Sequence, residues 1–162
     1  RLLVSLFLKT EGYLTNPILY FSLYLKKHRG DYYGCWSNVR IYGEYERWVK
    51  FFLNGIIVTA KQVIKTIKQI NDLKETWTKQ IIRLNKNNEE LLLKFLDFIF
   101  IMPYFNFNDL IKNLNVAKTT ANSIIKEFVN LKIIDSKESN KEKFNTYKVT
   151  KYLEILEKGT EI

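Results

Sequence analysis

The sequence has little of the residues that build disulfides and metal sites. Its 162 residues include one cysteine, Cys35, and one histidine, His28. A single cysteine cannot form an intramolecular disulfide, and a lone thiol fits a reducing cytoplasm. His28 has no second histidine or cysteine at a metal-ligand spacing, so we expect it to face solvent rather than to bind a metal. Cys35 has no histidine partner at a useful spacing, and we expect it to be buried.

Long apolar runs and glycine-rich loops are also missing. The run Leu2–Leu8 is apolar except for Ser5, but it is far shorter than the roughly 20 residues of a membrane span. It ends at Lys9 without the small-residue pattern of a signal cleavage site, and it predicts the buried face of a helix. No glycine-rich loop is present that would cradle a phosphate. Because the first residue is Arg1 rather than Met, we expect the natural protein to continue upstream.

The charge is unevenly distributed along the chain. Up to Lys86 there are 15 Lys or Arg and 6 Asp or Glu, whereas from Asn87 onward there are 11 of each sign. The polar break Asn85–Asn88 separates the two halves. We therefore predict two domains, residues 1–86 and 87–162, in a mainly α protein whose 46% hydrophobic and 15% aromatic content suits a folded core.

The first half is predicted to be helical. The expected helices are Leu2–Lys9, a helix capped by Ser22 that carries Leu23–Leu25, a helix capped by Asp31 and ended by Gly43, and a long helix from Glu44 to about Leu84. Lys61, Lys65 and Lys68 share one face of the long helix. That face is either solvated, which is the common case, or a surface that follows phosphates.

The second half is predicted to contain shorter helices and two strands. The expected elements are the helix Glu89–Ile101 ended by Pro103, the helix Phe107–Leu114 capped by Asn106, the helix Lys118–Leu131, the strands Ile133–Ser136 and Phe144–Val149, and the short helix Tyr152–Leu156. Two helices, a tight turn at Asn115, a third helix and a hairpin are the order of a winged helix-turn-helix. Asn115 and Lys132 stand where such domains usually have glycine.

The third helix of that order can enter a DNA major groove. Its outward positions carry small hydrogen-bonding groups and cations, which are the side chains that base edges and phosphates require: Lys118, Thr119, Thr120, Asn122, Ser123 and Lys126. Lys137, Lys141 and Lys143 of the hairpin loop are placed to meet the DNA backbone. The segment Lys112–Lys151 has nine lysines and four acidic residues. The alternative is a winged helix that docks a protein through a solvated polar face.

The first half also carries a resemblance to a known family. The segment RLLVSLFLKTEGYLTNPILYFSLYLKKHRGDYYGCWSNVR, followed by GEYERWVKFFLNG, resembles the part of a Fic-family (Fic/DOC-type) protein that follows the active-site loop. That loop has the form HxFx(D/E)GNGRxxR in the family, and Arg1 resembles its final arginine. The larger members of the family often end in a winged helix, so the resemblance extends over nearly the whole chain.

The resemblance implies an adenylyltransferase that moves AMP from ATP to a hydroxyl of a target protein, with Mg²⁺ as the metal. By position, Arg1 would bind the nucleotide phosphates and Tyr33 would line the adenine pocket. Tyr33 has a second interpretation, as a core tyrosine with a satisfied hydroxyl. The histidine, acidic residue and GNGR segment of the loop are absent, so this chain should hold no cofactor and should be inactive by itself.

Three hypotheses remain open from the sequence. The first is the C-terminal part of a Fic-type enzyme whose winged helix recruits DNA or a partner. The second is a stand-alone winged-helix DNA-binding regulator with a helical dimerisation region, in which a second copy of the chain is a partner. The third is a protein-interaction module. All three place the chain in the cytoplasm without a membrane association.

Overall fold

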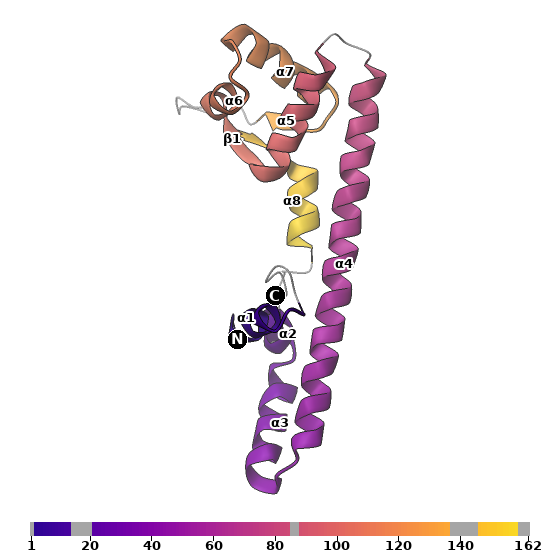
Figure 1. The fold of residues 1–162 in the computed structure, drawn as a ribbon, viewed down its shortest axis with the longest axis vertical. Helices are drawn as coiled ribbons and strands as arrows, with labels where there is room; N and C mark the ends of the chain where they lie inside the picture. The colour runs from indigo at the N-terminus through magenta and orange to yellow at the C-terminus, as the bar shows by residue number, and fades with distance from the viewer. Residues whose placement is uncertain (1, 14–20, 85–87, 137–145, 159–162) are drawn as a thin grey trace. The chain divides into compact units, whose positions relative to one another are not determined.

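The computed structural model describes residues 2–13, 21–84, 88–136 and 146–158 of the chain. These residues form eight helices and one three-stranded antiparallel sheet (Figure 1). The prediction of a mainly α protein with a small β-hairpin is confirmed. The chain divides into two compact units, residues 1–67 with 159–162 and residues 68–158. The domain boundary predicted after Lys86 falls outside the described residues.

The first unit is built from helices. They are α1 (Leu2–Thr10), α2 (Phe21–Lys27), α3 (Arg29–Tyr42) and the start of α4 (Tyr45–Arg83), which continues into the second unit. The long helix predicted from Glu44 to about Leu84 is confirmed. Gly43 ends α3 with φ 69°, in the left-handed region that glycine adopts without strain.

The two caps predicted in this unit are wrong. Helix α2 begins at Phe21, so Ser22 lies inside the helix rather than at its cap. Helix α3 begins at Arg29, and His28 occupies its N-cap. Asp31 lies instead in the first turn, where its carboxylate is favoured by the helix dipole and stands 3.6 Å from Nδ1 of His28. Sequence pattern missed these starts because α2 and α3 follow one another with only His28 between them.

The core of the first unit is aromatic. Phe21 and Leu25 of α2 are buried, and Phe51, Phe52 and Ile56 of α4 pack against them. The rings of Phe21 and Phe52 meet edge to face with centroids 4.8 Å apart. As expected, Cys35 is buried and His28 is exposed.

Gly55 allows α4 to approach α2 closely. A Cβ at this position would lie 2.5 Å from a ring carbon of Tyr24 and 2.8 Å from a ring carbon of Phe21. Neither ring can withdraw freely, because Phe21 is buried and Tyr24 packs against the same cluster. Gly55 is therefore required by packing rather than by backbone conformation.

We expect Gly55→Ala to destabilise the protein by about 1–3 kcal/mol, because the added methyl group overpacks the contact between α2 and α4. Gly34→Ala in α3 is the matched control, since nothing lies within 4 Å of a Cβ there. The control should be neutral or stabilising by up to about 1 kcal/mol through helix propensity. Urea unfolding followed by circular dichroism measures both. Equal effects of the two substitutions would contradict the close approach.

The second unit combines helices with the sheet. Its elements are the end of α4, α5 (Glu89–Ile101), β1 (Tyr104–Asn106), α6 (Phe107–Leu114), α7 (Lys118–Asn130), β2 (Asp135–Ser136), β3 (Thr146–Lys148) and α8 (Thr150–Glu157). The strand order is β1-β3-β2, and Phe105 pairs with Tyr147 while Asp135 pairs with Lys148. Figure 1 shows α5, α6 and α7 gathered around this sheet.

The predicted helices of this unit agree better with the structure than the predicted strands. Helices α5 and α6 have the expected bounds, and α7 ends one residue before the expected Leu131. The strand predicted at Ile133–Ser136 begins too early, because β2 begins at Asp135 and the buried residues Ile133 and Ile134 lie outside any strand. The strand predicted at Phe144–Val149 extends one residue past the end of β3, and its first two residues lie outside the described residues. Strand β1 was missed, since three residues after Pro103 are too few to show a period of two. Helix α8 is longer than the expected Tyr152–Leu156.

The core of the second unit centres on Phe95, which is fully buried. The centroid of its ring lies 4.5 Å from that of Phe128 in α7 and 5.6 Å from that of Phe105 in β1, and both pairs meet edge to face. Trp77 and Ile81, from the last turns of α4, belong to the same buried cluster. The cluster thereby joins α5, α7 and the sheet.

Two residues other than glycine have a positive φ in the described residues. Asn115 has φ 50° and Lys132 has φ 55°. At the end of α7 the N–H of Lys132 donates to the carbonyl of Val129, and the N–H of Ile133 donates to the carbonyl of Phe128. This is the Schellman arrangement, in which the left-handed residue is most often glycine. Asn115 tolerates the conformation, whereas Lys132 adopts it at a cost.

We expect Lys132→Gly to stabilise the protein by about 1 kcal/mol, because glycine adopts this conformation without the steric cost of a Cβ. Lys126→Gly, in the interior of α7, is the control and should destabilise by about 1 kcal/mol. Urea unfolding followed by circular dichroism measures both. A loss of stability in Lys132→Gly would show that the lysine side chain stabilises the fold.

Candidate nucleic-acid interface

Helix α7 is buried on one face and exposed on the other. Ala121, Ile124, Ile125 and Phe128 are buried in the core of the second unit. Because they recur every three or four residues, the remaining residues are left on the opposite face. The exposed residues of that face are Lys118, Thr119, Asn122, Ser123, Lys126 and Asn130.

The structure thus brings the predicted α7 residues together on one surface. Thr120 differs from the others, because it is half-buried at the edge of the face. Asn130 was not predicted, although it lies on the same face as Lys118, Asn122 and Lys126 at intervals of four residues. The spacing of four identifies it once the helix is known to extend to residue 130.

The two helices of the helix-turn-helix order begin differently: α6 is capped by side chains and α7 is not. At the start of α6, Asn106 accepts a hydrogen bond from the N–H of Asp109, and the Asp109 carboxylate accepts one from the N–H of Asn106. This capping box uses the polar side chains at that helix end. Ala117, at the N-cap of α7, supplies no side-chain hydrogen bond. The first amide groups of α7 are therefore not capped by the side chain that precedes them.

Three carboxylates of α5 and α6 are held in other interactions. Glu90 lies 2.7 Å from Nζ of Lys94 within α5, and this hydrogen bond and charge lower the pKa of Glu90 below its ordinary value. Asp97 pairs with Lys74 at 2.6 Å, and Asp109 closes the capping box. The exposed residues of α7 include two cations, Lys118 and Lys126, while the one carboxylate of the helix, Glu127, is half-buried. The local charge of the exposed face is positive although the second half of the sequence is neutral.

The remaining predicted residues lie elsewhere. Arg1 and the hairpin-loop lysines Lys137, Lys141 and Lys143 are outside the described residues. Tyr33 lies in α3 of the first unit and is 50% exposed, so the interpretation as a core tyrosine is wrong. The Arg29 guanidinium lies over its ring, 5.5 Å from the centroid. One face of Tyr33 is therefore occupied by a cation.

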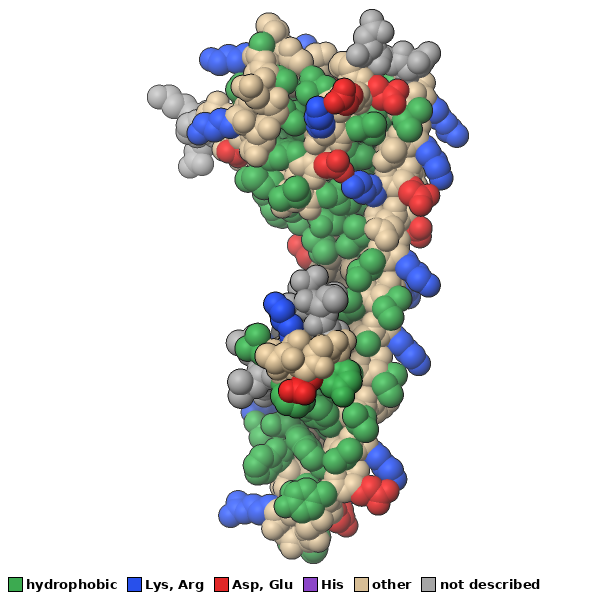
Figure 2. Space-filling view, viewed as in Figure 1, with side chains coloured by type: hydrophobic (Ala, Val, Ile, Leu, Met, Phe, Trp, Pro, Cys, Tyr) green, Lys and Arg blue, Asp and Glu red, His purple; other side chains and the backbone are tan. Residues whose placement is uncertain are grey.

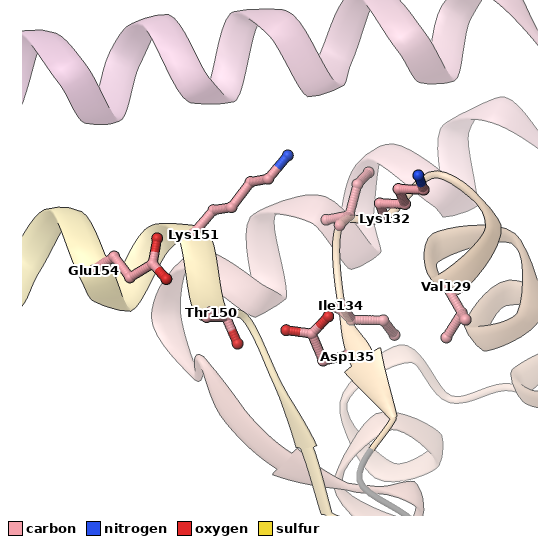
Figure 3. A pocket seen from close by; sticks show the side chains of 8 residues that line it. Val129, Lys132, Ile134, Asp135, Thr150, Lys151 and Glu154 are labelled. Carbon is pink, nitrogen blue, oxygen red and sulfur yellow. The ribbon is translucent and has the colours of Figure 1, made fainter.

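The second unit also has an open hollow of about 530 Å³ beside the end of α7. It is lined by Lys132, Asp135, Thr150, Lys151, Glu154 and three apolar residues. Figure 3 shows Asp135 and Thr150 facing one another across it, with Lys132 and Lys151 at its rim. Its charges are mixed, two ammonium groups with two carboxylates, so the hollow suits a nucleic-acid backbone less well than the face of α7.

In the part of the chain that the structure describes, no group of His, Cys, Asp or Glu side chains is arranged to hold a metal ion. Among the described helices, none is both long and apolar enough to cross a membrane. No protein-family model matches the sequence.

Proposed function

We propose that the second unit is a winged helix-turn-helix that binds duplex DNA with α7 in the major groove. The observation that carries the proposal is the exposed face of α7, which presents cations and short hydrogen-bonding groups, while the one carboxylate of the helix, Glu127, is half-buried. The order of α5, β1, α6, α7, β2 and β3, with the sheet order β1-β3-β2, supports it. A helix of this diameter fits the major groove of B-form DNA.

Each part of the face has a role in this proposal. Lys118 and Lys126, two turns apart, contact phosphates on either side of the groove. Asn122 lies between them and offers the paired donor and acceptor that recognise an adenine edge. Thr119 and Ser123 supply further hydrogen bonds. The uncapped amide groups at the start of α7 add a favourable site for a phosphate.

We expect Lys118→Ala and Lys126→Ala each to weaken binding to a duplex by about threefold to tenfold, because each removes a phosphate contact. Each should also reduce the slope of log affinity against log salt by about 1. Fluorescence anisotropy with labelled duplex, measured over a range of salt concentrations, gives both quantities.

The matched control is Lys61→Ala in the basic stretch of α4, which should leave affinity within about twofold of the parent chain because it lies outside the proposed interface. A larger loss with Lys61→Ala than with the α7 variants would favour the phosphate-following surface on the long helix. Absence of binding at low salt would leave protein docking as the function of the winged helix.

We propose in addition that the chain is the C-terminal part of a Fic-type AMP transferase. The sequence resemblance from Arg1 to Phe52 supports this. So does the exposure of apolar side chains on α1, where Leu6 is 50% and Phe7 is 61% exposed, although the sequence predicted a buried face there. Such a surface is expected where the upstream part of the enzyme would pack. A protein of this kind works in the cytoplasm, where the unpaired thiol of Cys35 stays reduced.

In this proposal Tyr33 lines the adenine pocket of the complete enzyme and Arg1 binds phosphate, while ATP and Mg²⁺ depend on the upstream loop. The chain by itself should transfer no AMP, since the histidine base and the metal-binding acid belong to that loop. Reading the natural coding sequence upstream of Arg1 tests the proposal. An HxFx(D/E)GNGR segment is the expected result, and a start codon directly before Arg1 would refute it.

A further inference from the structure

Helix α4 has a second apolar face besides the one that packs on α2. Leu53, Ile57, Ile64 and Ile67 are exposed by 52%, 51%, 54% and 43%, and half-buried Ala60, which also packs against the α2 cluster, lies between them at the edge of this face. We call these five residues the α4 seam. Hydrophobic side chains run along α4 in Figure 2 beside a row of charged side chains, most of them Lys or Arg.

The spacing of the seam is that of a coiled coil. Its members follow one another by four, three, four and three residues, which is the 3.5-residue repeat that keeps an apolar seam against a partner helix. In this repeat Ile57 and Ile64 occupy a positions, which favour β-branched side chains. Leu53 occupies a d position, which favours leucine. The seam therefore fits another helix better than it fits a flat surface.

One edge of the seam is basic. Lys50, Lys61 and Lys65 are exposed and lie on the side of the helix away from α2, as helical spacing requires. After Glu46, which pairs with Lys50 at 2.6 Å, the next acidic residue in the sequence is Asp72. The seam thus runs through a stretch of α4 that contains cations and no carboxylate.

This charge pattern distinguishes between occupants. A second copy of the chain would bring the same cations and no compensating carboxylate to the pair, which disfavours self-association. Amphipathic helices that lie on membranes usually carry cations on both sides of the apolar face, whereas the other side of this seam is packed against α2. A partner helix with Asp or Glu beside its apolar stripe would match both the apolar seam and its basic edge.

We propose that the α4 seam binds an acidic amphipathic helix of a partner protein. The partner helix sets its apolar stripe against Leu53, Ile57, Ile64 and Ile67, and its carboxylates pair with Lys61 and Lys65. This surface lies in the first unit, so the inference does not depend on DNA binding by α7.

The probe is a synthetic peptide of three heptads with Ile at a, Leu at d and Glu at e and g. The comparison peptide has Lys at e and g. We expect the acidic peptide to bind the intact chain at least about tenfold more tightly than the basic one at low ionic strength. The double variant Lys61→Glu/Lys65→Glu should reverse that preference, while Lys9→Glu in α1 should leave it unchanged. Fluorescence anisotropy with labelled peptide measures the affinities.

A pair of apolar substitutions on the same helix tests the seam itself. Ile64→Ser should weaken binding of the acidic peptide by at least about tenfold. Val58→Ser is the matched control, because Val58 is 43% exposed but lies off the seam. It should change affinity by no more than about twofold. Both variants should keep the circular dichroism of the parent chain, since neither residue is buried.

Three results would overturn the proposal. The first is no binding of the acidic peptide, or binding that Ile64→Ser and Val58→Ser affect equally. The second is a dimer of the chain, seen by light scattering, that Ile64→Ser converts to a monomer, since a second copy would then occupy the seam. The third is Ile64-dependent binding to vesicles of phosphatidylserine and phosphatidylcholine without binding to the acidic peptide.

Discussion

The packing of Phe95 against Phe128 is the interaction on which the second unit depends. It holds α7 against α5 by its apolar side and so determines which residues of α7 meet solvent. The same ring contacts Phe105, which ties β1 and the rest of the sheet to the two helices. Because the inward residues of α7 are apolar and recur at helical spacing, the outward residues are the polar ones by necessity. The candidate interface is thus a consequence of the core.

The ends of α6 and α7 complete this arrangement. The capping box of Asn106 and Asp109 fixes the start of α6, and the left-handed residue Asn115 turns the chain toward α7. After α7, the left-handed residue Lys132 directs Ile133 and Ile134 back into the core before β2 begins. Lys132 adopts this conformation at a position where glycine is usual. The hydrogen bonds of the Schellman turn nevertheless form on both sides of it.

Much of this fold was predictable from the sequence. The helices with a strong period and a clear end, such as α5 before Pro103 and α6 after Asn106, have the predicted bounds. Asn115 and Lys132 were singled out as positions where a winged helix would carry glycine, and both have a positive φ. The short strands were not, because two or three residues give no alternation to detect and their register depends on pairing with β3. The starts of α2 and α3 were not predicted. Ser22 and Asp31 were expected to cap these helices but lie inside them, and only His28 separates the two helices.

The candidate site was predictable to a similar degree. Helical periodicity alone separated the buried residues of α7 from the exposed ones, but the half-burial of Thr120 depends on packing that no spacing rule contains. The exposed seam of α4 was not predicted, since its apolar residues have the same helical spacing as the residues that pack on α2. Only the structure separates the covered face from the exposed one.

The most direct test of the account is to observe the amide signals of the isotope-labelled chain by nuclear magnetic resonance while duplex DNA is added. The account predicts that the largest shifts occur along the exposed face of α7, from Lys118 to Lys126, and that the α4 seam is unaffected. Shifts concentrated at Lys61 and Lys65 of α4, with the signals of α7 unmoved, would contradict it.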